Sequence, residues 1–108
     1  MSHIELARWA DALLIAPCTA ETISRLASGR GDDLLTTITL AFDGPIAIAP
    51  AMNQAMWRDS RTQDNVSKLV ANNTLICGPG TGEQGLRRCW YRKDARTRRS
   101  IKYFFIFI

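Results

Sequence analysis

The chain has 108 residues, of which 46% are apolar, and a formal net charge of +4. This length is that of one small domain or of part of a larger one, and this composition excludes an intrinsically disordered chain. No apolar run approaches the roughly 20 residues that a membrane-spanning helix needs, and the first residues lack the basic and apolar regions of a signal peptide. We therefore expect no membrane partner.

The first half of the chain alternates between strand and helix patterns. An apolar run over 12–16 predicts a strand that ends at Pro17. Residues 19–28 follow as a helix, with Thr19 as the N-cap and Gly29 as the stop. A second helix begins at Asp32-Asp33, where two acids suit the positive end of a helix, and continues to Leu40.

The second half repeats this alternation. A buried strand is expected over 46–49, a helix over 60–72 and a short strand over 74–77. Ser60 and Gln63 have the spacing of a capping box at the start of that helix. Strands buried on both faces, with helices between them, predict a Rossmann-like open parallel α/β sheet.

Ligands of such sheets bind beyond the carboxyl ends of the strands, so the ends of the first two strands are candidate sites. The first strand runs into Thr19 and a helix N-terminus, which suits a phosphate or the polar edge of a heterocycle. The second continues into PAMNQAMW, where one amide, Asn53, stands among apolar residues. Taken alone, the first pattern favours an ordinary N-cap and the second favours a helix cap within a Met-rich corner.

Other polar and aromatic residues have structural explanations. Cys18, Cys77 and Cys89 are odd in number and far apart, which predicts a reducing cytoplasm without disulfides or a zinc site. The first two are expected to be small buried residues, and Trp9 to lie in the core. The Asp32-Asp33 pair resembles a metal-binding cluster, but capping explains it better, so we expect no metal.

Three segments in this order, HIELARWADALLIAP, TAETISRLASGRGDDLLTT and APAMNQAMW, resemble the homo-oligomeric flavin-containing cysteine decarboxylases. The resemblance extends over residues 2 to 84 and is greatest to the members that act on phosphopantothenoylcysteine in coenzyme A biosynthesis. It implies FMN as cofactor, phosphopantothenoylcysteine as substrate, a trimer-based homo-oligomer and a cytoplasmic lyase. By their positions in these motifs, the resemblance implies catalytic roles for His3 and Asn53. It implies that Asn53 and Met56 bind the substrate, and that FMN is bound by Thr19, Ala20, Glu21, Thr22 and Ala51.

The chemistry that the resemblance implies is oxidative decarboxylation to 4′-phosphopantetheine. The flavin accepts two electrons from the cysteinyl group, CO₂ leaves the resulting thioaldehyde, and the electrons return to the product. His3 would act as a base near neutral pH, and the Asn53 amide would hold a polar substrate group without adding charge. The alternatives are a peptidyl-cysteine decarboxylase, which stops at the enethiol, and a non-enzymatic flavin-binding regulator of the same family.

Residues 85–108 depart from the family pattern. They hold eight Lys/Arg and one acid, a net charge of +7, whereas residues 1–84 carry −3. A basic tail is typical of nucleic-acid binding, but this one looks foreign, so we expect no nucleic-acid partner. After Gln84 the family continues Ala-Cys-Gly-Asp, whose cysteine protonates the product, and Leu86 occupies that place here. We also expect the sheet to be incomplete, because the family's first strand and glycine-containing phosphate loop have no counterpart in this sequence.

A frameshift near Gln84 would explain the tail. The run from Gly85 to Trp90 can be encoded by GGC CTG CGG CGA TGT TGG, which reads Ala-Cys-Gly-Asp-Val one nucleotide later. We therefore interpret residues 1–84 as the C-terminal part of a flavoprotein domain and 85–108 as a non-native, disordered tail. The aromatic end, from Tyr103 to Ile108, resembles an aggregation-prone segment.

Overall fold

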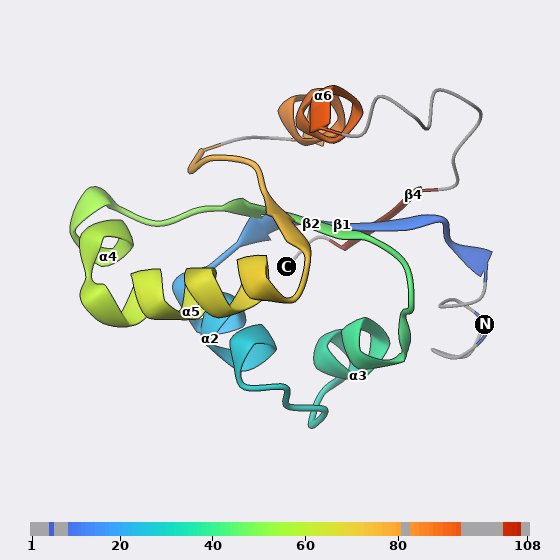
Figure 1. Ribbon diagram of the computed structural model, residues 1–108, viewed down its shortest axis with the longest axis horizontal. Helices are drawn as coiled ribbons and strands as arrows, with labels where there is room; N and C mark the ends of the chain where they lie inside the picture. The colour runs from blue at the N-terminus through green and yellow to red at the C-terminus, as the bar shows by residue number, and fades with distance from the viewer. Residues whose placement is uncertain (1–4, 6–8, 81–82, 94–102, 107–108) are drawn as a thin grey trace.

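The computed structural model describes residues 5, 9–80, 83–93 and 103–106, and arranges most of them around one parallel sheet (Figure 1). In chain order the elements are β1 (Ala12–Cys18), α2 (Ala20–Ala27), α3 (Leu34–Ala41), β2 (Ile46–Pro50), α4 (Gln54–Arg58), α5 (Ser60–Ala71), β3 (Thr74–Ile76), α6 (Glu83–Lys93) and β4 (Tyr103–Ile106). The predicted open parallel α/β fold is confirmed.

The four strands lie in the order β3-β2-β1-β4, and every neighbouring pair is parallel. Because β1 and β2 are the two inner strands, their carboxyl ends lie next to each other at one edge. The register pairs Ile15 with Ile48 and Cys18 with Pro50, so β1 has one more residue than β2 over this stretch. This irregularity is a bulge, and it lies where the two strands leave the sheet.

Side chains alternate between the two faces of the sheet, as the period of a strand requires. On one face Ile15, Ile48 and Cys18 pack with residues of α2 and α5, and Leu13 packs with α3. The other face of β1 and β2 is rich in alanine and holds Ala12, Leu14, Ala16, Ala47 and Ala49. The inner strands are therefore buried on both sides, which is why they read as continuous apolar runs.

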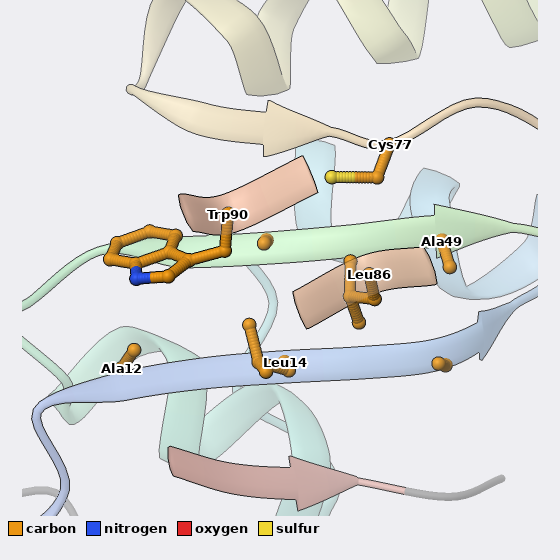
Figure 2. Close-up of a cluster of buried hydrophobic side chains, with 8 residues drawn as sticks. Ala12, Leu14, Ala49, Cys77, Leu86 and Trp90 are labelled. Carbon is orange, nitrogen blue, oxygen red and sulfur yellow. The ribbon is translucent and has the colours of Figure 1, made fainter. Parts of the chain in front are cut away.

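Helices cover both faces of this sheet. In Figure 1, α2, α3 and α5 lie on one side, and α6 lies on the other. Leu86 and Trp90 of α6 pack onto the face that is rich in alanine, and both are buried (Figure 2). Because alanine side chains are small, two large α6 side chains fit against the strands.

The sequence predicts a disordered tail over residues 85–108, but the parts of it that the structure describes form regular secondary structure. Most of α6 falls within them, and β4 pairs with β1 through Ala12↔Tyr103 to Ile15↔Ile106. The physical reason lies in the spacing of Leu86, Cys89 and Trp90, which places three side chains on one helix face. The guanidinium of Arg87 also lies 4.6 Å from the centre of the Phe105 ring, so α6 contacts β4.

The observed N-cap residues agree with the predicted ones, with one correction. Thr19 and Asp33 are N-caps as predicted, and Asp33 forms a capping box with Thr36. The cap of α5 is Asp59 rather than Ser60, because its carboxylate accepts a hydrogen bond from the backbone N–H of Arg61 at 2.8 Å. A carboxylate is as good an N-cap as a hydroxyl, so the capping-box spacing of Ser60 was misleading.

Two further predictions are corrected. Cys77 and Cys89 form a disulfide, although their separation in sequence gave no sign of it. They meet because α6 folds back over the end of β3, a docking that the sequence did not predict. Trp9 is 42% exposed rather than buried, whereas Cys18 and Cys77 are buried as expected. Among the described helices, none combines the length and the hydropathy that a bilayer crossing requires.

Candidate functional site

The ends of β1 and β2 are joined at the carboxyl edge of the sheet. The backbone N–H of Ala51 donates a hydrogen bond to the carbonyl of Cys18 at 2.9 Å. This bond brings the residue before Thr19 against Ala51, so the two segments that were predicted to contact FMN lie together. They meet where ligands of open α/β sheets bind.

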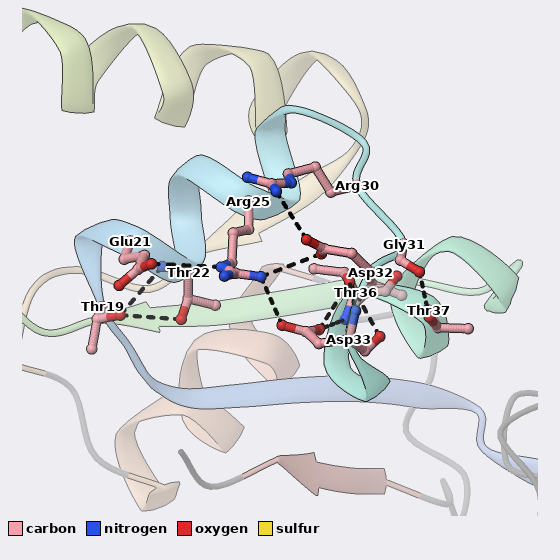
Figure 3. A network of polar contacts seen from close by, with 11 residues as sticks. Thr19, Glu21, Thr22, Arg25, Arg30, Gly31, Asp32, Asp33, Thr36 and Thr37 are labelled. Carbon is pink, nitrogen blue, oxygen red and sulfur yellow. Dashed lines mark hydrogen bonds and ion pairs between the residues drawn. The ribbon is translucent and has the colours of Figure 1, made fainter.

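The first turn of α2 presents polar groups at this edge. The Thr19 hydroxyl accepts a hydrogen bond from the Thr22 backbone N–H at 3.3 Å and lies 3.1 Å from the Thr22 hydroxyl (Figure 3). The N–H groups of Ala20 and Glu21 have no carbonyl four residues back within the helix, so they are available as donors. Thr22 is buried and Thr19 is exposed, so the hydroxyl pair spans the boundary of the site.

A network of charges organises the helix that carries this turn. Arg25 makes ion pairs with Asp32 at 3.2 Å and Asp33 at 3.0 Å, and it lies 3.7 Å from Glu21 (Figure 3). Hydrogen bonds from Thr36, together with Arg25 and Arg30, lower the pKa of Asp33. Asp33 therefore caps α3, and both Asp32 and Asp33 bind Arg25. Each exposed pair contributes little to stability, but together they position the α2–α3 loop.

The exit of β2 carries the predicted substrate residues. Asn53 is the N-cap of α4, and its Oδ1 accepts a hydrogen bond from the Met56 backbone N–H at 2.8 Å. Because Oδ1 is used in this cap and Asn53 is exposed, the Nδ2–H groups are the part of the amide that can donate to a ligand. Met56 is 46% exposed on the same helical turn. Asn53 is thus a helix cap, and its predicted contact with the substrate stays a prediction.

These residues fit a flavin ring better than its phosphate. Ala20 and Ala51 are small and partly exposed, so they leave room for a flat ring beside the first turn of α2. The Ala20 and Glu21 N–H groups can donate to ring carbonyl oxygens, as a helix N-terminus does for other acceptors. The carboxylate of Glu21 disfavours a phosphate at the same place. A flavin bound here would supply redox chemistry beside Asn53.

Gly80 is a contributor that the sequence did not indicate. Its backbone N–H donates to the Pro50 carbonyl at 2.9 Å, while the Cys77 N–H donates to the Ile48 carbonyl at 3.0 Å. The φ of Gly80 is +79°, a conformation that glycine adopts most easily. The Gly78-Pro79-Gly80 pattern predicted the end of a strand, but a bond to a distant carbonyl leaves no mark in sequence. The segment after β3 therefore supports the exit of β2.

Two other features lie outside this chemistry. Burial raises the pKa of the Cys18 thiol to about 12, so Cys18 is a neutral packing residue beside the site. A cavity of about 680 Å³ lies at the opposite, amino edge of the sheet. Its walls include the helix ends and strand starts at Ala27, Phe42, Ile46, Asn72 and Thr74. None of the predicted site residues that the structure describes lines it.

The described residues bring most of the predicted site together. Thr19, Ala20, Glu21, Thr22 and Ala51 meet at the joined strand ends, and Asn53 and Met56 share the next helical turn. His3 lies outside the described residues, so its role as a base stays a prediction.

Comparisons with known proteins agree with this arrangement. A protein-family model described as Flavoprotein matches residues 1–87. The coenzyme A biosynthesis bifunctional protein CoaBC of Vibrio cholerae is 56% identical over 84 residues, and that of Escherichia coli is 49% identical over 84 residues. Each alignment covers 78% of this chain and 21% of the relative, so the chain spans about a fifth of these relatives.

Solved structures give the same result in three dimensions. The FMN-dependent cysteine decarboxylase SpaF is 42% identical with a TM-score of 0.69, over 74% of this chain and 46% of that one. A PPC decarboxylase mutant complexed with pantothenoylaminoethenethiol is 43% identical with a TM-score of 0.66, over 68% of this chain and 42% of that one. With a family model matching most of its length, and with the strand-end geometry above, the chain belongs to the Flavoprotein family.

Proposed function

We propose that this chain forms part of the active site of an FMN-dependent decarboxylase that converts phosphopantothenoylcysteine to 4′-phosphopantetheine in coenzyme A biosynthesis. The observation that carries the proposal is the Ala51–Cys18 hydrogen bond, which unites the predicted FMN-facing and substrate-facing segments. The identity of 49–56% to CoaBC proteins supports the choice of substrate.

Each segment has a distinct task in this proposal. The first turn of α2, with Ala20 and Glu21, donates N–H groups to the flavin ring, and Ala51 leaves space for it. When bound there, FMN would supply two-electron redox chemistry to the cysteinyl group. Asn53 donates from Nδ2 to the carboxylate that leaves as CO₂, and Met56 forms an apolar wall beside it. His3 is proposed as the base that removes the substrate proton.

A chimeric enzyme tests the proposal. The 84 residues of Escherichia coli CoaBC that match this chain are replaced by the corresponding residues of this chain, and CO₂ release from phosphopantothenoylcysteine is measured. Turnover within about tenfold of the parent enzyme is expected, because Asn53 and the α2 turn would be in place. A chimera that binds FMN but releases no CO₂ from this substrate would refute the proposal.

A peptidyl-cysteine decarboxylase is the second candidate, because the structural similarity to SpaF is as close as that to the PPC decarboxylase. The same chimera distinguishes the two candidates when it is given a peptide that ends in cysteine. Faster turnover of the peptide than of phosphopantothenoylcysteine would favour the second candidate. The lower identity of this chain to SpaF than to CoaBC favours the first.

We further propose that the protein acts in the cytoplasm as a homo-oligomer built on trimers. Large apolar side chains are exposed on three helices: Leu34 at 67%, Leu40 at 59% and Met56 at 46% on α3 and α4, and Val70 at 55% on α5. Burial of such side chains between subunits would stabilise an assembly. Light scattering of the chimera should give a multiple of three subunits, and a monomer that turns over would contradict this proposal.

We also propose that residues 85–108 are read in a shifted frame. The alignments to CoaBC proteins extend over 84 residues. Among the described residues, the Trp90 indole Nε1 is buried without a hydrogen-bond partner, which is rare in evolved cores. Sequencing the gene across the Gln84 codon should reveal Ala-Cys-Gly-Asp in the neighbouring frame. Its absence would refute the frameshift without affecting the proposed activity.

A further inference from the structure

The helix α4, which follows Asn53, needs contacts with the rest of the chain to stay in place. It has five residues, and none of them is buried. A helix of this length is not stable in water by itself, because so few hydrogen bonds do not offset the cost of nucleation. Trp57 is partly buried and packs against the apolar cluster that includes Ile48 and Val66. Apolar contacts are not directional, so this packing holds α4 near the core without fixing its orientation.

A directional contact comes from Gln63, in the first turns of the neighbouring helix α5 (Figure 1). The Gln63 Nε2 donates a partly buried hydrogen bond to the Trp57 backbone carbonyl at 2.5 Å. Because a carbonyl oxygen can only accept, the nitrogen of the Gln63 amide is the atom that faces it. Trp57 lies in the last turn of α4, where carbonyls lack an N–H partner within the helix. Gln63 therefore caps the C-terminal end of α4 from another helix.

This contact differs from the one that the sequence pattern predicts for Gln63. In a capping box, the glutamine side chain bonds back to the start of its own helix. Here Asp59 caps α5 by accepting from the Arg61 N–H at 2.8 Å. The Gln63 side chain is directed to the preceding helix instead. Replacing this side chain should therefore leave the cap of α5 in place.

The two ends of α4 are linked by consecutive hydrogen bonds. The Trp57 carbonyl accepts from Gln63, and the Trp57 N–H donates to the Asn53 carbonyl at 3.0 Å. The Asn53 Oδ1 in turn accepts from the Met56 N–H at 2.8 Å. Five helical residues span only about 7.5 Å, so a shift at Trp57 is transmitted to Asn53.

We propose that Gln63 is a positioning residue of the substrate site, which holds α4 through Trp57 and so fixes the direction of the Asn53 amide. This inference rests on the proposed function, in which the Asn53 Nδ2 donates to the substrate carboxylate. Gln63 itself contacts no substrate and acts through α4 alone. Its effect on turnover follows from geometry, because a misplacement of about 1 Å at a reacting centre can cost about a hundredfold in rate.

The first test uses the 108-residue chain and needs no activity. Gln63→Met keeps the size and the helix propensity of the side chain but removes the donor. Gln54→Met is the matched control, because it makes the same change at an exposed position of α4. Hydrogen exchange of the Met56 and Trp57 amides is followed by NMR. Gln63→Met should speed their exchange by about threefold to tenfold, as expected for one lost hydrogen bond. Equal exchange in the two variants would overturn the proposal.

The second test measures kcat and KM of the chimera for phosphopantothenoylcysteine, well below the melting temperature of every variant. Gln63→Met should lower kcat/KM by about threefold to tenfold with unchanged flavin content, and Gln54→Met should keep the parental value. A parent chimera without turnover would refute the proposed function and this inference together. An active parent whose kcat/KM is not changed by Gln63→Met would overturn this inference alone.

A double-mutant cycle separates positioning from a general effect on the fold. Asn53→Ser keeps a good N-cap residue but removes the amide that reaches the substrate. In this background Gln63→Met should have no further effect on kcat/KM, because no amide remains to be positioned. The same fold-loss in both backgrounds would show that Gln63 does not act through Asn53, and would overturn the proposal.

Discussion

At the scale of single residues, Asn53 caps α4 with one end of its amide, and we propose that the other end binds the substrate. Its oxygen accepts a hydrogen bond from the Met56 backbone N–H in the first turn of α4, and its nitrogen carries two N–H groups that can act as donors. Substitution by aspartate separates these tasks, because aspartate caps helices as well as asparagine does but has no donor. The residue can therefore be examined without unfolding the turn on which it stands.

In the chimera, Asn53→Asp should retain FMN and melt at the same temperature as the parent, yet lose turnover by about tenfold to a hundredfold. Loss of a hydrogen bond to a charged group lowers turnover by about this much, and repulsion between the new aspartate and the substrate carboxylate lowers it further. Asn53→Ala should also lose about 1 kcal/mol of stability with the cap. Flavin absorbance, thermal melting and CO₂ release are measured. Gln54→Ala, the exposed neighbouring residue, serves as the control; parental turnover by Asn53→Asp would exclude the role of Nδ2.

Asp59 links α4 to α5 and has an acid-sensitive contact. Hydrogen bonds from the side chain and the backbone N–H of Arg61 lower its pKa from the ordinary 3.8 to about 2. A depressed pKa in the folded state stabilises the fold above about 3.8, and this contribution is lost as the pH falls from about 3.8 through about 2.

Asp59→Asn should flatten the acid side of the stability curve, because asparagine keeps the cap but does not titrate. The urea midpoint of the chain is measured from neutral pH down to about 2. Ser67→Ala, at an exposed position of the same helix, removes no titrating group and should leave the acid side of the curve unchanged. If both variants follow the parent curve, the Asp59–Arg61 contact does not contribute to stability in solution.

At the scale of elements, the sequence predicts what local signals determine and misses what distant contacts determine. Thr19 and Asp33 cap their helices as expected, since an N-cap depends on a few consecutive residues. The disulfide from Cys77 to Cys89 depends on the docking of α6 over the sheet, so no local pattern could reveal it. The same holds for the bond from Gly80 to Pro50.

The predicted site residues show the same difference between local signals and distant contacts. A family motif places Asn53 and Thr19 correctly at neighbouring strand ends, because the carboxyl ends of parallel strands share one edge. The residues around Asn53 taken alone predict a helix cap, and Asn53 caps α4 as predicted. Trp9 was expected in the core because aromatic residues are often buried, and its exposure depends on contacts that no local pattern specifies.

The docking of α6 can be tested through Leu86, which is fully buried against the alanines of the sheet. Leu86→Ala should lower the free energy of unfolding by about 2–5 kcal/mol, because it leaves a cavity between helix and sheet. Val70→Ala removes an exposed side chain, and should cost about 0.5 kcal/mol or less. Urea unfolding of the oxidised chain is followed by circular dichroism. Equal losses for the two variants would show that α6 is not docked in solution.

At the scale of the whole molecule, four strands and helices on both faces enclose the inner strands. The radius of gyration is 13.2 Å, close to the roughly 13 Å of a compact domain of this length. Yet the chain spans 21% of the CoaBC proteins and 46% of the SpaF structure. It can therefore be compact and still hold only part of a decarboxylase site.

The 108-residue chain by itself should not form 4′-phosphopantetheine. The α2 turn suits the flavin ring, but Glu21 disfavours a phosphate there, so binding of FMN should be weak. The chain is expressed, its flavin content is read from absorbance, and product formation from phosphopantothenoylcysteine is assayed beside the chimera. Stoichiometric FMN together with product formation by the chain alone would contradict this prediction.

The hydrogen bonds that hold the exit of β2 on both sides also restrict how this family can diverge. The Cys18 carbonyl, at the end of β1, accepts from the Ala51 N–H, and the Gly80 N–H, after β3, donates to the Pro50 carbonyl. Side chains at Ala51 and Met52 can therefore be replaced while the chain path is conserved. Insertion or deletion of a residue there would break the spacing that both neighbours impose. New substrate ranges should accordingly arise by point replacement at these positions, with loop length held constant across lineages.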